Sequence, residues 1–282
     1  MISLAAICLN EEEFIAGWLE YHYQSFDRIV ICEGADRNYP HDAVTREGLS
    51  ADRTADIIRS FPDPERKIQF FQHGWAGRKG SRDDRVPAKI VLRNDYARHL
   101  PDGYTFTLDV DEFLHPNHVR ALVAEMDERP DLDAYAIPQL HLWQSPRQFI
   151  TGGYADMPHT RLYRWQAGSR YEVSHNRPCG PDGRSLATQC KKGALLVNEG
   201  ELRAPAIIHY GFCENKASMA DKFQYYLNRG EAKTRPETSE FRRAALLDEV
   251  PSGCLIRRYR GFLPLRDADR RPRAVRRLHL TR

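Results

Sequence analysis

The sequence has no long apolar run, no C-x-x-C cysteine pair and no large excess of charge. No apolar stretch approaches the roughly 20 residues of a membrane-spanning helix, and the chain does not open like a secretory signal. Its six cysteines are scattered, and two of them, Cys8 and Cys32, lie inside apolar runs. We therefore expect a cytoplasmic protein with reduced thiols that does not span a membrane.

Net charge and length further limit the class of protein. The 42 basic and 39 acidic residues leave a net charge of +3 over 282 residues, which indicates an ordinary globular protein without a nucleic-acid partner. The length fits one large α/β domain with an appendage, or two small domains. Arginines concentrate between Arg257 and Arg277. This tail is either simply solvated or makes a peripheral contact with anionic lipid headgroups at the inner membrane face, or with an acidic acceptor.

The most informative stretch is the apolar run over residues 104–114, which we expect to be a strand. It contains Asp109, Asp111 and Glu112 near its end. In extended geometry Asp109 and Asp111 project to the same face, and a turn there would let both reach one divalent ion. Carboxylate oxygens suit magnesium or manganese, which complete their shells with water and substrate phosphates. The alternative is that these acids are solvated and cap a helix over residues 117–129.

The rest of the first two hundred residues alternates strand and helix patterns. Asn10, with Glu13 three residues later, predicts a capped helix start after a first strand. Glu33 and Asp36 follow a second strand, at the carboxyl edge where open α/β sheets bind ligands. A loop over residues 74–85 has the composition of an anion-binding or merely solvated segment. Further strands are expected over 2–9, 28–32, 67–71, 134–142 and 206–210, helices over 54–60, 88–100 and 216–229, and a hairpin over 161–175.

Several motifs, in order, resemble the glycosyltransferases of the GT-A fold, specifically the family 2-like group. They are CLNEEE at 8–13 with WLEYH at 18–22, the segment 75–94, LDVDEFL at 108–114, RLYR at 161–164 with YEVSH at 171–175, and HYGF at 209–212. The match covers most of residues 1–230. The resemblance implies an α/β fold with a GT-A type, Rossmann-like mixed sheet flanked by helices in residues 1–215, and a mainly helical extension in residues 216–282.

The resemblance also implies a nucleotide-sugar donor at the carboxyl edge of the sheet. Asp109 and Asp111 would hold Mn²⁺ or Mg²⁺ on its diphosphate, which gives Asp111 a catalytic role, and His209 would be a third ligand or a phosphate contact. A metal ion suits this chemistry because a departing nucleoside diphosphate needs its charge neutralised. The other donor-binding positions that the resemblance implies are Asn10, Glu33, Asp36, Arg85, Lys89 and Arg93.

The general base is less well defined by the motifs. An inverting sugar transfer needs a base within hydrogen-bond reach of the acceptor hydroxyl. Related enzymes show a glutamate after the histidine at the position of His175, whereas this chain has Asn176. Glu172 is the first replacement and Asp156 the second, with His175 positioning the acceptor or orienting the base. The acceptor is a glycan, a lipid-linked molecule or a protein.

Two other classes remain as alternatives. A strand that runs into Asp-x-Asp also resembles phosphatases of the haloacid dehalogenase type, but these require Thr or Val where this chain has Phe113. The missing glutamate after His175 is also consistent with a nucleotide- or sugar-binding module that has no turnover. Hydrolysis of nucleotide sugars distinguishes the second class from a transferase.

Overall fold

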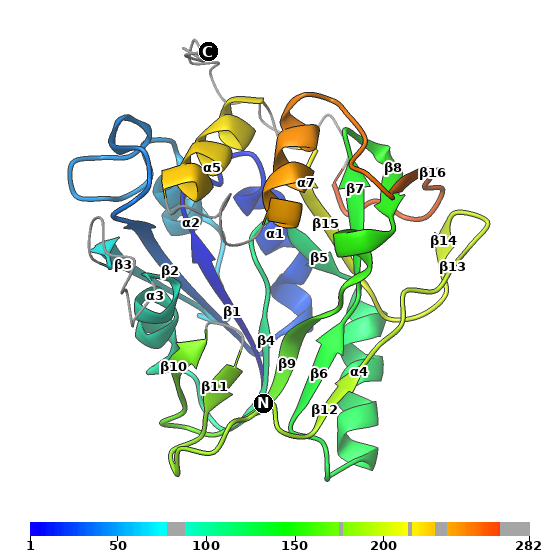
Figure 1. Ribbon diagram of the computed structural model, residues 1–282. Coiled ribbons are helices and arrows are strands. Elements are labelled where there is room, and N and C mark those ends of the chain that lie inside the picture. The colour runs from blue at the N-terminus through cyan, green and yellow to red at the C-terminus, as the bar shows by residue number, and fades with distance from the viewer. Residues whose placement is uncertain (78–87, 175–176, 214–215, 229–235, 266–282) are drawn as a thin grey trace.

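The computed structural model describes residues 1–77, 88–174, 177–213, 216–228 and 236–265. It is a mixed α/β structure in which a seven-stranded sheet has the order β12-β6-β9-β4-β1-β2-β3 (Figure 1). Strands β4, β1, β2 and β3 are parallel, whereas β9 runs antiparallel to β4 and to β6. These strands are β1 (Ile2–Cys8), β2 (Arg28–Asp36), β3 (Ile68–Ala76), β4 (Gly103–Thr107), β6 (Ala134–Ile137), β9 (His159–Trp165) and β12 (Cys190–Lys192).

A second sheet has five strands in the order β16-β8-β7-β15-β5. Strand β15 lies between β5, which is antiparallel to it, and β7, which is parallel to it. These strands are β5 (Glu112–Leu114), β7 (Gln139–Trp143), β8 (Ser145–Thr151), β15 (Ile207–Phe212) and β16 (Leu255–Arg258). Two short hairpins, β10 (Arg170–Ser174) with β11 (Arg177–Cys179) and β13 (Val197–Asn198) with β14 (Glu201–Leu202), complete the strands of the described residues.

The chain passes from the first sheet to the second at two places where we expected one continuous strand. Residues 108–111 separate β4 from β5, and Pro138 separates β6 from β7. Proline has no backbone N–H, so it cannot continue a ladder as a donor, while its carbonyl accepts from the N–H of Ile207 at 2.9 Å. The two expected strands are therefore each split, and the acidic segment lies at the junction of the two sheets.

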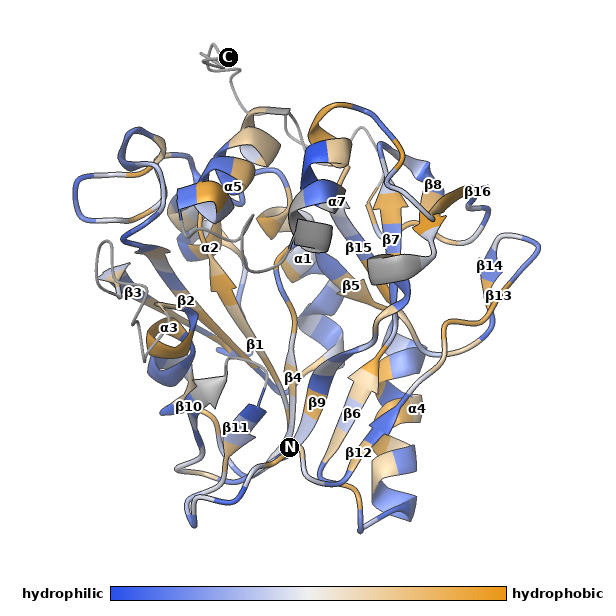
Figure 2. Cartoon of the chain, in the orientation of Figure 1, coloured by the Kyte–Doolittle hydropathy of each residue, from blue (hydrophilic) through white to orange (hydrophobic). Residues whose placement is uncertain are grey.

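Helices cover both faces of the seven-stranded sheet. In β1, Leu4 and Ala6 join one core with α1 (Ile15–His22), α2 (Thr54–Ser60) and α4 (Pro116–Glu128), while Ala5 joins a second core with α3 (Ala88–Ala97). Alternate residues of a strand point to opposite faces, so a strand buried on both sides is apolar throughout. Figure 2 shows mainly hydrophobic residues along β1 and a mixture of polarities around α4. The predicted α/β fold with a mixed sheet flanked by helices is confirmed.

Three predictions of local structure are wrong. Helix α1 begins at Ile15 without a side-chain cap, and Asn10 has a left-handed φ of 57°. Strand β2 continues to Asp36, so Glu33 lies within the strand rather than after it. Strand β10 pairs with β11, not with β9, so the expected hairpin does not form. The alternative in which the acids cap α4 is also wrong, because the cap is His115, whose Nδ1 accepts from the N–H of Asn117 at 3.1 Å.

The C-terminal part contains α5 (Lys216–Asn228), α7 (Pro236–Leu246) and β16. Strand β16 pairs with β8, and the Tyr210 hydroxyl donates to the carbonyl of Leu265 at 3.1 Å, so this part is attached to the second sheet. The boundary after residue 215 stays a prediction. Among the helices of the described residues, none has both the length and the apolar composition needed to cross a membrane. All six cysteines are free in the structure.

Candidate active site

Charged side chains meet where β4 ends and the chain crosses to β5. We call this group the central cluster. Within it, Asp109 Oδ2 accepts from Arg161 Nη2 at 3.0 Å, and Asp109 Oδ1 lies 3.8 Å from Arg93 Nη2. The Asp109 side chain keeps 33% of its surface exposed. The central cluster is made of Lys89, Arg93, Asp109, Asp111, Glu112, Arg161, His209 and Lys222.

Arg161 links two of the carboxylates in the central cluster. Besides Asp109, its guanidinium also contacts Glu112, whose side chain is only 1% exposed. Gln139 donates to Glu112 Oε1 at 2.5 Å, and Glu112 Oε2 accepts from the N–H of Asp109 at 2.9 Å. A buried carboxylate needs such partners because its charge has lost the solvation of water. Arg161 and Gln139 thus fix the segment that carries Asp109.

Asp111 points to a different set of cations. Its Oδ2 lies 3.5 Å from His209 Nε2 and 3.4 Å from Lys222 Nζ on α5. The Nδ1 atom of His209 is in turn 2.6 Å from Nδ1 of His141, on the adjacent strand β7. Gly211 is required beside this pair, because a Cβ there would lie 2.5 Å from His209 Nε2 and 2.8 Å from Asp111 Oδ2. This explains the glycine in the HYGF motif.

The charges in the central cluster shift each other's pKa values. Burial would raise the pKa of Asp109, but Arg161 and Lys89 hold it well below its usual range. Burial raises the pKa of Glu112 despite the opposing effect of Arg161. Burial would lower the pKa of His209, but the Asp111 carboxylate raises it above its usual value. Asp109 is therefore a carboxylate, and His209 takes up a proton more readily than an isolated histidine.

Arg93 is a buried cation of the central cluster with unsatisfied hydrogen-bond donors. It is 3% exposed, and its Nε and Nη1 atoms are buried without a hydrogen-bond partner in the described part of the chain. Its guanidinium lies over the ring of Tyr171, 5.6 Å from the centroid. Nε of Arg161 is likewise buried without a partner there. Buried donors of this kind ordinarily have a partner, so these atoms indicate a place where a ligand would be bound.

Two predicted donor-binding residues, Asn10 and Glu33, form hydrogen bonds within the protein. Asn10 Nδ2 donates to the carbonyl of Ala43, and its Oδ1 accepts from the N–H of Ala51, both at 2.8 Å. Glu33 is fully buried and accepts from the N–H of Ser50 at 3.0 Å and from Gln72 Nε2 at 2.7 Å. Their carboxamide and carboxylate groups hold the segment over residues 43–51 against the end of β1 and against β2.

Asp36, unlike Asn10 and Glu33, is only partly buried. It ends β2, and its Oδ2 accepts from the Tyr225 hydroxyl of α5 at 3.1 Å, while its Oδ1 accepts from the N–H of Asn38 at 2.9 Å. The ring of Tyr225 lies 5.6 Å from that of Tyr39. Aromatic and polar side chains therefore gather at the carboxyl end of β2, which is two strands away from β4 in the same sheet.

The predicted general bases are not part of the central cluster. Glu172 on β10 is 40% exposed and forms an ion pair of 2.5 Å with Arg170. Asp156 is exposed and accepts from the N–H of Gly152 at 2.9 Å. Arg85 and His175 lie outside the described residues. The role of Glu172 as base, and those of Arg85 and His175, stay predictions.

The residues predicted to hold a metal ion do not form a ready three-ligand set. In the described ranges, no three histidine, cysteine, aspartate or glutamate side chains gather as a metal-binding group. Asp109 and Asp111 have basic neighbours, Arg161 and Lys222 respectively. Asp109 nevertheless fits a hard cation, because part of its carboxylate is exposed and such ions take their remaining ligands from water and phosphate.

Several residues of the site were not identified from the sequence. Gln139 and His141 belong to a predicted strand that has no predicted role, and Lys222 and Tyr225 lie on a helix predicted to belong to the C-terminal extension. Arg161 belongs to the RLYR motif, which predicts no function for it. The sequence signal for Arg161 is a charged residue inside an apolar strand pattern. No local sequence pattern indicates that α5 reaches the sheet edge.

Comparison with known proteins shows a similarity of fold only. No protein-family model and no curated protein matches the chain. Among solved structures, S. aureus TarS 1–349 with UDP has 11% identity and a TM-score of 0.44, and the match covers 87% of this chain and 70% of that one. Its complex with UDP-GlcNAc has 14% identity and a TM-score of 0.35, with 50% and 35% covered.

A third neighbour is the mannosyltransferase PcManGT from Pyrobaculum calidifontis in complex with GDP-Man and Mn²⁺. It has 11% identity and a TM-score of 0.40, and the match covers 83% of this chain and 64% of the neighbour. In two of these three comparisons the chain therefore spans less than two thirds of the other protein. Likenesses this distant assign neither activity nor ligands to the chain.

Proposed function

We propose that the chain is a glycosyltransferase that moves a sugar from a nucleoside-diphosphate donor to a hydroxyl group of a glycan, lipid-linked or protein acceptor. The observation that carries this proposal is the composition of the central cluster. Lys89, Arg93, Arg161 and Lys222 surround three carboxylates at the carboxyl edge of a parallel sheet. Such edges are where α/β folds bind ligands, and a departing diphosphate needs fixed positive charge around it.

Arg93 and Lys89 are the proposed contacts of the diphosphate. Both lie on α3, and the buried N–H groups of Arg93 that lack a partner in the described residues would be satisfied by phosphate oxygens. A guanidinium donates two parallel hydrogen bonds to a phosphate, which fixes the orientation of the ligand as well as adding affinity. Arg161 is already engaged with Asp109 and Glu112, so its role is to hold the acidic segment in place.

Asp109 and Asp111 are the proposed ligands of a divalent ion, Mn²⁺ or Mg²⁺. When bound, the ion would supply Lewis-acid stabilisation of the diphosphate. Asp109 offers an exposed carboxylate oxygen, and Asp111 is fixed by His209 and Lys222. His209 is better suited to a phosphate contact than to a metal ligand, because its raised pKa favours the cation, whereas a ligand must be neutral.

The nucleoside would extend from the central cluster toward the end of β2. There Asp36 is the proposed ribose or base contact, with Tyr39 and Tyr225 beside it. Glu33 and Asn10 support this edge through their hydrogen bonds to residues 43–51 and do not contact the donor. Glu172 remains the proposed general base of an inverting transfer, with His175 orienting it or the acceptor.

Hydrolysis of a panel of UDP-, GDP-, CMP- and dTDP-sugars, with manganese, with magnesium and with chelator, tests the proposal. We expect one donor to be hydrolysed in a metal-dependent way, and Arg93→Lys to weaken its binding because the guanidinium fork is lost while the charge remains. If a nucleotide sugar binds but is neither hydrolysed nor transferred with any metal or acceptor tested, the chain is instead a non-catalytic binding module. Release of phosphate from simple phosphomonoesters would favour the phosphatase alternative.

A further inference from the structure

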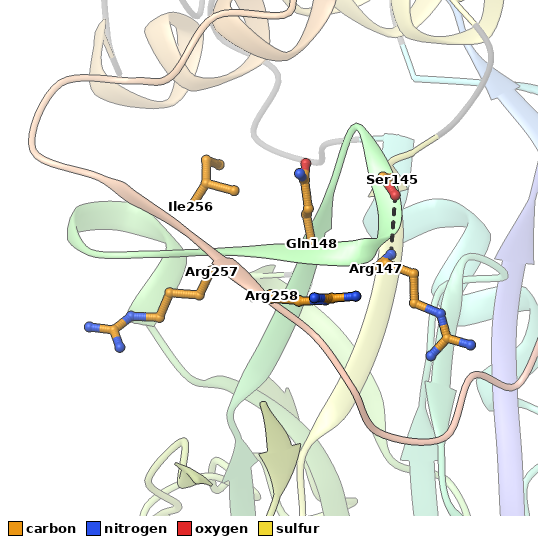
Figure 3. A pocket seen from close by; sticks show the side chains of 6 residues that line it. All are labelled: Ser145, Arg147, Gln148, Ile256, Arg257 and Arg258. Atoms are coloured by element: carbon orange, nitrogen blue, oxygen red, sulfur yellow. Dashed lines mark hydrogen bonds between the residues drawn. The ribbon is translucent and has the colours of Figure 1, made fainter. Parts of the chain in front are cut away.

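A hollow of about 280 Å³ lies on the five-stranded sheet, at the edge formed by β8 and β16. We call it the edge hollow. Its lining contains no acidic residue and consists of Ser145, Arg147, Gln148, Ile256, Arg257 and Arg258 (Figure 3). Strand β16 is three strand spacings from β15, which carries His209, and this corresponds to about 14 Å across the sheet. The edge hollow is therefore separate from the central cluster.

Pairing of two strands brings these arginines together. Strand β16 is antiparallel to β8, with Arg258 opposite Gln148, and the N–H of Tyr259 donates to the carbonyl of Arg147 at 2.8 Å. In Figure 3 the side chain of Arg258 extends toward the side of the hollow where Arg147 lies, and Arg257 extends to the opposite side of β16. The backbone ladder thus holds cations from two distant segments around one hollow.

No carboxylate among the described residues forms an ion pair with these cations. Within the described ranges, Arg147, Arg257 and Arg258 form no ion pair, and the Arg147 guanidinium donates only to the carbonyl of Gly261 at 3.4 Å. Other exposed arginines do have partners, since Arg203 pairs with Glu201 at 3.3 Å and Arg243 with Glu249 at 3.5 Å. The edge hollow therefore has a positive potential that attracts anions from solution.

We propose that the edge hollow binds a phosphate group. Guanidinium groups match the tetrahedral oxygens of phosphate with paired hydrogen bonds. The Ser145 hydroxyl and the Gln148 carboxamide add neutral donors at the same place. The phosphate belongs either to a soluble anion or to a lipid headgroup, and both present the same chemistry. This proposal does not depend on the proposed sugar transfer, because it uses no residue of the central cluster.

Calorimetric titration of the full chain with inorganic phosphate at low ionic strength tests this directly. We expect R147Q/R258Q to weaken the edge-hollow binding by about tenfold or more, because two charge-assisted contacts are lost. The matched control is R120Q/R129Q, which removes the same charge from the exposed surface of α4 and its end and should leave binding unchanged. Phosphate bound at the central cluster would persist in both variants.

A second variant tests whether weaker phosphate binding results from a change in folding. R257Q/R258Q removes two exposed arginines that have no ion-pair partner among the described residues, so thermal unfolding should be unaffected while phosphate binding again weakens. Cosedimentation with vesicles of phosphatidylglycerol or of phosphatidylcholine then identifies the source. Binding to phosphatidylglycerol that is lost in R147Q/R258Q assigns a lipid headgroup, and loss of phosphate binding alone assigns a soluble anion. Titrations of R147Q/R258Q and R120Q/R129Q that superimpose on the wild type would overturn the proposal.

Discussion

The central cluster and the edge hollow are both rich in arginine, but they hold it in opposite ways. Arg161 is buried and shared between Asp109 and Glu112, whereas Arg258 is exposed and has no ion-pair partner in the described residues. A buried ion that loses its partner is strongly destabilising, while an exposed one is solvated and contributes little. The first arrangement therefore builds a fixed site, and the second leaves cations available for a ligand.

The largest expected effect is the loss of the buried arginine. Arg161→Met removes the cation that faces Glu112 and should lower the free energy of unfolding by about 3–5 kcal/mol. The matched change Arg258→Met should alter it by no more than about 0.5 kcal/mol, because no contact of a buried group is lost. Denaturant titration of both variants measures the difference. Equal stabilities would remove the contrast between the two regions.

Loss of a carboxylate from the central cluster should affect activity more than folding. Asp111→Asn keeps the shape of the side chain but removes the charge that faces His209 and Lys222. We expect donor turnover to fall by about 10²–10³-fold, the size of one preorganised electrostatic contact, with manganese-dependent donor binding lost. Wild-type turnover of Asp111→Asn in metal-free buffer would refute the metal-site proposal.

Glu172 offers a test at a site that is neither buried nor part of the central cluster. If it is the general base, Glu172→Gln should lower kcat by about 10²-fold with donor affinity little changed. Its ion pair with Arg170 is exposed, so stability should change by less than about 1 kcal/mol. An unchanged kcat with the true acceptor would assign the base elsewhere, and the edge hollow variants serve as activity controls.

Much of the fold followed from the sequence because apolar periodicity is local. The run over residues 2–9 predicted β1 within one residue, and the helix over 54–60 was predicted with the bounds of α2. The errors arose where tertiary pairing decides. Residues 104–114 look continuous, but their two halves join different sheets, and only the position of Pro138 hinted at the second crossing.

The site was predictable only in part, for the same reason. Asp109 and Asp111 stood out because acids at the end of an apolar run are unusual. Glu33 also stood out, yet its carboxylate is used by Ser50 and Gln72, a pairing that depends on segments far apart in the sequence. Lys222 reaches Asp111 from more than a hundred residues away. No pattern along the chain encodes such contacts.

The smallest expected effect is a difference in how anion binding by the central cluster and by the edge hollow depends on pH. The guanidinium groups of the edge hollow stay charged at all accessible pH values, whereas His209 titrates with a pKa raised by Asp111. Burial keeps the neighbouring His141 neutral by lowering its pKa well below the usual value. The positive charge on His209 is therefore present below its raised pKa and lost as the pH rises through it.

Sulfate suits this measurement because its charge does not change between about pH 5.5 and 8, the range in which histidine titrates. In the R147Q/R258Q background, sulfate affinity of the central cluster should fall by up to about tenfold, or about 1.4 kcal/mol, as the pH rises. The added change His209→Gln should make the sulfate affinity of the central cluster independent of pH. Sulfate binding by the edge hollow should be independent of pH in every protein that retains Arg147 and Arg258. A metal-ligand role would show the opposite slope for manganese, because only neutral imidazole binds the ion. Identical sulfate and manganese profiles with and without His209 would mean that it has neither role.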